Sequence, residues 1–87
     1  MRKLNKDIDV LATFRTGEPP EPHKFRVNDR YGNVHVIKIG QILDITEQKN
    51  LGYDLWNYKC QGRVGNSIRA YDIQYNVQKA QWKLVRI

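Results

Sequence analysis

The sequence predicts an all-β protein: a small antiparallel barrel, or a strongly twisted sheet, with five or six strands. Two observations support this prediction. Short runs of alternating apolar and polar residues follow one another, and turn signals rich in Gly, Asn and Asp separate them roughly every dozen residues. No segment shows an extended helical period. A rolled sheet is favoured because a flat one would leave long edges free to pair.

The chain has 87 residues, which is the size of one domain. Residues 1–7, MRKLNKD, are predicted to be a flexible leader, and residues 8–87 a single β domain. The first strand is predicted at 8–14, IDVLATF, because its apolar residues alternate. The residues predicted to share its inner face are Ile8, Val10, Ala12 and Phe14.

Residues 16–22, TGEPPEP, interrupt this alternation. Three prolines within four positions lack the N–H groups that a sheet ladder needs. We therefore predict an extended, exposed connection. The less favoured alternative is a polyproline II ligand for a partner of the SH3 type.

A hairpin is predicted around NDRYGN, residues 28–33, because Asn, Asp and Gly are turn formers. The arm before the turn carries Phe25 and Val27 on one face. This register places His35 near position 28 and His23 near position 40, so the two imidazoles do not meet. Both histidines are predicted to lie on the surface.

The arm after the turn, VHVIKIGQILDI, is long and its alternation changes parity. The residues on its two faces are Val34 and Val36, and Ile37 and Ile39. This change predicts a bulge or bend, for which Gly40 is the natural place. Residues 40–49 could instead form a short helix. Three β-branched residues within five positions favour a strand that continues to about residue 47.

Residues 53–64 include WNYKCQGR, where aromatic and cationic residues stand close together in the sequence. In a strand, Trp56, Tyr58 and Cys60 share one face. The opposite face would carry Leu55, Asn57, Lys59, Gln61 and Arg63. A binder of single-stranded nucleic acid needs aromatics and cations on the same exposed face. We therefore predict that the aromatic residues of this stretch are in the core and its cations are in water.

Two more strands complete the prediction. SIRAYDIQYNV follows the turn GNS at 65–67, and WKLVRI follows the short break VQKAQ. In the last strand, Trp82 and Leu84 share one face, while Val85 and Ile87 share the other.

The net charge is +6, and it is spread evenly: residues 1–43 and residues 44–87 each carry +3. A single cysteine excludes an intrachain disulfide and a cysteine-based zinc site. The sequence contains neither an apolar run long enough to span a membrane nor an apolar signal sequence. A reducing cytoplasm is the expected location.

Five segments in this order suggest a family: IDVLATF, HKFRVND, VHVIKIGQILDI, WNYKCQGRV and the closing WKLVRI. The arrangement resembles that of small β-rich proteins of Gram-positive bacteria that carry no assigned activity. The resemblance covers nearly the whole chain. It implies an antiparallel β domain in a bacterial cytoplasm, and it implies no site residues.

The sequence carries no motif of catalysis or of phosphate or cofactor binding. Ser67, the only serine, lies in a turn. Cys60 could be a nucleophile, but a small buried apolar residue is the favoured interpretation. The pairs Asp7/Asp9 and Asp44/Glu47 are common surface arrangements. We therefore expect no enzyme activity, no cofactor and no metal site.

Two functions remain. The favoured one is a protein-interaction module that pairs with a partner, or with itself, through an exposed edge strand. The alternative is a module that binds nucleic acid or another polyanion through an outward basic face. The candidate residues of that face are Lys24, Arg26, Lys59, Arg63 and Arg69. Tyr71 and Tyr75 share parity with Arg69 and could lie beside it, although Ile73 suggests that this face is buried.

Overall fold

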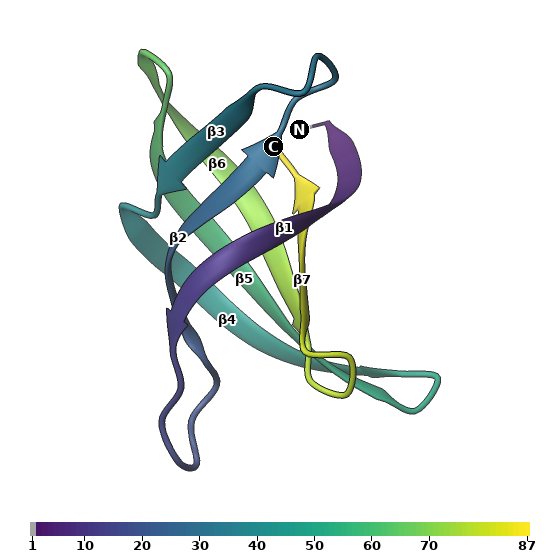
Figure 1. The fold of residues 1–87 in the computed structure, drawn as a ribbon. Coiled ribbons are helices and arrows are strands. Elements are labelled where there is room, and N and C mark those ends of the chain that lie inside the picture. The colour runs from purple at the N-terminus through teal and green to yellow at the C-terminus, as the bar shows by residue number, and fades with distance from the viewer. Residues whose placement is uncertain (1) are drawn as a thin grey trace.

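The computed structural model describes residues 2–87, whose regular structure is entirely β (Figure 1). Seven antiparallel strands form one sheet that curls into a half-barrel. The strands are β1 (Lys3–Thr13), β2 (Glu21–Asn28), β3 (Val34–Lys38), β4 (Gln41–Asn50), β5 (Tyr53–Val64), β6 (Ser67–Asn76) and β7 (Gln81–Arg86). Their order across the sheet is β3-β2-β1-β7-β6-β5-β4.

The all-β prediction is confirmed, with one strand more than expected. The long arm after the hairpin is divided between β3 and β4, which lie at opposite edges of the sheet. The predicted bend at Gly40 is therefore a corner between two strands. Residues 41–50 form a strand, as favoured over a helix, and β4 runs three residues beyond position 47.

β1 curls the sheet because its two halves pair with different neighbours. Residues 3–8 pair with β7, and residues 9–13 pair with β2. Register shifts between Lys3 and Lys6 and between Leu11 and Ala12 bend the strand. The three strands β1, β2 and β3 consequently fold across β4–β7, as Figure 1 shows.

Residues 3–7 belong to β1 and not to a flexible leader. The backbones of Arg2 and Ile87 exchange two hydrogen bonds, of 2.8 and 3.0 Å, which extend the β1–β7 ladder. Leu4 packs against the core, so the inward alternation starts before Ile8. Lys6 stands between Leu4 and Ile8 on the same side and is half-buried, and this charged residue hid the pattern in the sequence. Met1 lies outside the described residues.

The concave face of the sheet encloses a core rich in aromatic side chains. Its buried residues are Ile8, Phe25, Ile37, Tyr58, Cys60, Tyr71, Ile73, Tyr75, Trp82 and Leu84. The rings pack in tilted and edge-to-face pairs, with Tyr75 and Trp82 at 4.6 Å and Phe25 and Tyr71 at 5.5 Å between centroids. Such large side chains let a short chain fill its interior with few residues.

The predicted orientation of β5 is largely confirmed. Tyr58 and Cys60 are buried, Trp56 is half-buried against the core, and Lys59 is exposed. Leu55, predicted on the opposite face, lies outside the main core cluster but is nevertheless buried. The β6–β7 turn is hydrogen-bonded to the neighbouring Asp54, and we attribute the burial of Leu55 to this turn.

Phe14 was also predicted inward and is instead 62% exposed. β1 ends at Thr13, so Phe14 leaves the alternation of the strand. Its ring rests on the rim of the core, where it meets Tyr75 edge-on at 5.8 Å between centroids.

The proline segment is not an exposed connection throughout. Pro20 and Pro22 are buried, and Pro22 lies in β2, paired with Ala12 at the bulge of β1. A bulge tolerates proline because a ladder hydrogen bond is already lost there. The Pro20 carbonyl accepts a hydrogen bond from the hydroxyl of Tyr58, which ties this segment to the core.

Gly40 and Gly62 allow two backbones to touch at the corner between β3 and β4. The Gly40 amide donates to the Gln61 carbonyl over 3.0 Å. A Cβ on Gly62 would lie 3.0 Å from both the Gly40 nitrogen and the Lys38 carbonyl oxygen, and 3.1 Å from the Tyr71 hydroxyl. Gly62 lies buried within β5.

We predict that Gly62→Ala lowers the free energy of unfolding by about 1–3 kcal/mol, because a methyl group there overpacks rigid backbone. Chemical denaturation followed by circular dichroism measures this loss. Gln61→Ala, at the exposed neighbouring position, is the control and should change little. An unchanged stability in Gly62→Ala would contradict the close contact.

Two buried tyrosine hydroxyls form a second test of the core. The Tyr58 hydroxyl has a partner in the Pro20 carbonyl, whereas the Tyr71 hydroxyl has none among the described residues. We predict that Tyr58→Phe costs about 1–3 kcal/mol, because it leaves a buried carbonyl unpaired. Tyr71→Phe should leave stability unchanged or raise it by up to about 1 kcal/mol. Equal losses in the two variants, measured by thermal or urea unfolding, would count against this assignment.

Candidate protein-binding edge

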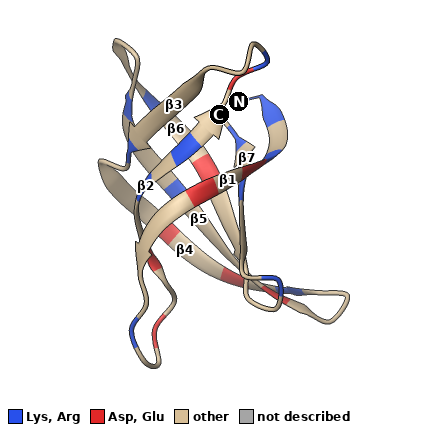
Figure 2. Ribbon diagram, viewed as in Figure 1, with Lys and Arg blue, Asp and Glu red and all other residues tan. Residues whose placement is uncertain are grey.

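The five predicted basic residues do not form one surface. Lys24 and Arg26 lie on β2, and Lys59 and Arg63 lie on β5. The sheet places β1, β7 and β6 between these two strands. Figure 2 shows basic and acidic residues interleaved along the strands, without a continuous basic face in this view.

Carboxylates on neighbouring strands also lie beside two of these basic residues, Arg26 and Lys59. Arg26 pairs with Asp9 at 2.8 Å. Lys59 stands in register between Asp44 of β4 and Asp72 of β6. Arg69 is exposed near the start of β6.

The aromatic residues that share parity with Arg69 are in the core. Tyr71 is fully buried, Tyr75 is 9% exposed and Ile73 is fully buried. The indication from Ile73 was therefore correct, and Arg69 has no exposed tyrosine of this strand beside it.

β3 presents a free backbone edge, which the hydrogen bonds at its two ends define. The Ile39 amide donates to His23, and the Asp29 amide donates to Asn33. In an antiparallel ladder, hydrogen-bonded pairs alternate with non-bonded pairs. Phe25–Ile37 and Val27–His35 are thus the bonded pairs between these ends. The residues whose N–H and C=O groups point away from β2 are Val34, Val36 and Lys38, and of these the Lys38 carbonyl lies against Gly62 of β5.

The side chains on the outer face of this strand are exposed. Val34 is 57% exposed and Val36 is 65% exposed. The sequence placed them on the face opposite Ile37, and the structure shows that Ile37 is the buried one. β-branched residues on an uncovered edge strand favour pairing with another extended segment.

An apolar cavity of about 480 Å³ lies beside the free edge of β3. It opens between β3 and the end of the β5–β6 hairpin, near the two chain ends (Figure 1). Its apolar lining residues include Leu4, Val36, Ile37, Val64, Leu84 and Ile87. A cavity of this size at the mouth of a barrel can hold a few apolar side chains of a bound segment.

The other edge of the sheet, along β4, is protected. Leu43 forms a bulge where the register against β5 shifts between Ile42 and Asp44. Pro19 and Pro20 line the same cleft as Leu43, so the proline segment lies beside this edge. Bulges and proline segments are the features by which natural sheets prevent unwanted pairing. This protection extends over residues 42–45 of β4, whereas residues 46–50 of that strand are exposed.

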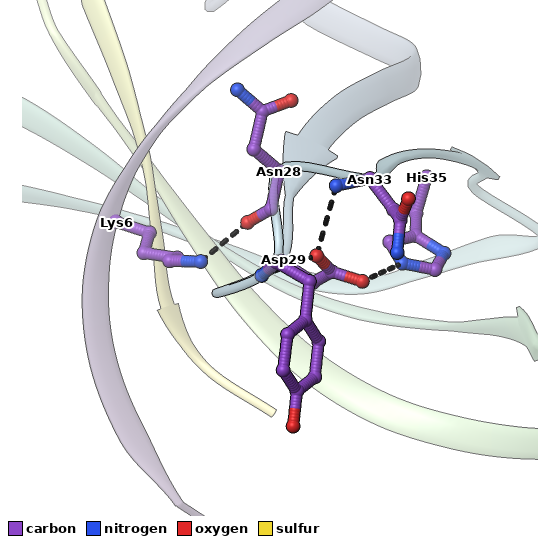
Figure 3. Close-up of polar contacts among 6 residues, drawn as sticks. Lys6, Asn28, Asp29, Asn33 and His35 are labelled. Atoms are coloured by element: carbon purple, nitrogen blue, oxygen red, sulfur yellow. Dashed lines mark hydrogen bonds and ion pairs between the residues drawn. The ribbon is translucent and has the colours of Figure 1, made fainter.

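The turn that leads into β3 is held by Asp29 (Figure 3). Its carboxylate accepts hydrogen bonds from the amides of Tyr31 and Asn33, at 2.8 and 2.9 Å, and contacts His35 Nε2 at 2.9 Å. The bond to His35, together with those from the backbone amides, lowers the pKa of Asp29 to about 2. Lys6 of β1 donates to the Asn28 carbonyl next to it. These bonds fix the start of β3 without using its free edge.

Cys60 is a core residue whose thiol is shielded from solvent. Its side chain is 1% exposed, and burial, followed by the nearby charge of Asp72, raises the pKa of the thiol to about 12. His23 contacts Thr13 and His35 contacts Asp29, both at the surface, so the two imidazoles are engaged separately. Within residues 2–87, no three His, Cys, Asp or Glu side chains are grouped as a metal site.

No protein-family model, curated protein or solved structure matches this chain. Among the described residues there is also no helix with the length and apolar character needed to cross a membrane. The fold defines the protein at the level of class: a small β half-barrel whose two edge strands are β3 and β4.

We predict that Cys60 does not react with a thiol reagent such as DTNB in the native protein, and reacts fully in denaturant. Because the folded pKa is raised, the stability linked to the neutral thiol is complete below about pH 9 and is lost as the pH rises toward 12. Cys60→Ala should therefore make the alkaline loss of stability shallower. The loss should persist in part, because burial also raises the pKa of Tyr71 to about 12. Rapid labelling of the folded protein would contradict this.

Proposed function

We propose that this protein is a non-catalytic interaction module that binds an extended segment of a partner protein at the free edge of β3. The observation that carries the proposal is the combination of unpaired Val34 and Val36 backbone groups with the adjoining apolar cavity. An added strand gains main-chain hydrogen bonds from β3, and its inward side chains enter the cavity. We place this module in the cytoplasm.

Polyanion binding has less support than strand addition. Its candidate cations are divided between β2 and β5, and Arg26 is paired with Asp9. The backbone of nucleic acid requires several cations along one path to release counterions together. We therefore do not develop this alternative into a proposal.

The direct test is an NMR titration of the labelled protein with a neutral strand-forming peptide, acetyl-Val-Gln-Val-Gln-Val-amide. We expect its largest amide shift changes at Val34, Val36 and Lys38. The proposal is refuted if the β3 amides show no shift changes at millimolar peptide and no other ligand binds through β3. Sedimentation of the protein alone, run in parallel, detects pairing between two copies.

We predict that Val36→Pro abolishes peptide binding while the protein stays folded. The Val36 amide points away from β2, so proline removes a donor of the free edge and no bond of the β2–β3 ladder. Val36→Thr is the matched control, because it keeps the amide and the β-branched shape. Circular dichroism verifies folding of both variants. Equal binding by Val36→Pro and the wild-type protein would exclude pairing at this edge.

A further inference from the structure

The charges beside the free edge of β3 indicate what kind of segment binds there. Lys38 lies at the end of β3, directly opposite Lys24 of β2 in the register. Like charges directly opposite each other destabilise a strand pair. Neither lysine forms an ion pair with a carboxylate of the described residues. The pair thus leaves an uncompensated positive charge at the edge.

Arg63 adds a third cation on the other side of the opening. It lines the same cavity as Val36 and Ile37, and it follows Gly62, which lies against the Lys38 carbonyl. Arg63 likewise has no carboxylate partner in the described part of the chain. A strand added to β3 would therefore pass between Lys38 on one side and Arg63 on the other.

Successive side chains of a strand point to opposite sides, so an added strand meets the cavity on one side and the exposed face of β3 on the other. Side chains of the added strand that lie on the side of Ile37 enter the apolar cavity. Those on the opposite side lie beside Val36 and Lys38, where the uncompensated charge is positive. At the other end of β3, the Asp29 carboxylate is already engaged by His35 and by two amides. Lys6 also lies at that end, where its ammonium is bonded to the Asn28 carbonyl. Lys38 is thus the cation at the Lys38 end of β3 that an added strand can meet.

We propose that the segment bound by β3 alternates apolar residues, which face the cavity, with acidic residues, which face Lys38. This inference rests on the proposed function and adds the chemistry of the partner. A second copy of this chain is disfavoured as the occupant, because each copy carries a net charge of +6. β3 has five residues, so a segment of about five residues covers it.

Three peptides of one length test the inference by isothermal titration calorimetry or NMR: acetyl-Val-Glu-Val-Glu-Val-amide, its Gln counterpart and its Lys counterpart. We expect the acidic peptide to bind about fivefold more tightly than the neutral one at low salt, and the basic peptide more weakly than both. The advantage should vanish at about 1 M salt, where exposed charges are screened.

Charge reversal on the protein identifies the residues responsible. Lys38→Glu should remove the preference for the acidic peptide and leave binding of the neutral peptide intact. Lys79→Glu changes the net charge equally. Lys79 lies in the β6–β7 turn, and the cavity lies at the other end of β6, beside the β5–β6 hairpin, so this variant should keep the preference. Equal loss in both variants would show an effect of net charge alone and would overturn the assignment to this edge.

The outcomes separate the two proposals. If the neutral peptide binds at β3 as tightly as the acidic one, the acidic partner is excluded and strand addition stands. If no peptide binds and the protein is monomeric, both proposals fail. If the protein dimerises, and Val36→Pro abolishes the dimer, the occupant is a second copy and the acidic-partner inference is overturned.

Discussion

The close approach of two backbones at Gly40 and Gly62 is the constraint on which the shape of this protein depends. Neither residue could carry a side chain without meeting backbone atoms at about 3.0 Å. The contact lets the chain turn from β3 into β4 directly against β5, with the Gly40 amide bonded to Gln61. β4 pairs only with residues 53–61 of β5, so residues 62–64 of β5 have no ladder partner on that side. The opening beside β3 is a consequence of this corner.

The corner also explains why the two edges of the sheet differ. β4 continues along β5 and meets the proline segment, whose Pro20 carbonyl is held by the buried hydroxyl of Tyr58. β3 lies against Gly62 of β5 at Lys38, and from there to the Asp29 turn Val34 and Val36 are exposed. The proline segment thus shields part of one edge, and β5 shields only the end of the other.

Charge in this protein acts locally. The net charge of +6 is distributed over both halves of the chain, and Arg26, Lys83 and Arg86 each face a carboxylate on a neighbouring strand. Only the register of the sheet reveals that Lys24 and Lys38 oppose each other. Their importance therefore comes from their position at an open edge and not from the total charge.

The sequence by itself determined the all-β class, the hairpin, the separation of Val34 and Val36 from Ile37 onto opposite faces, and the burial of Tyr58 and Cys60. These features follow from local alternation and turn chemistry, which act over a few residues. Only the tertiary structure decided that residues 3–7 extend β1, that Pro22 is part of a strand, that Leu55 is buried and that the basic residues of β2 and β5 lie apart. It also decided that β3 is an edge with a cavity beside it. Strand order, and hence which edges stay free, depends on contacts between residues far apart in the chain, and an alternating pattern reads the same in an edge strand and in a central one.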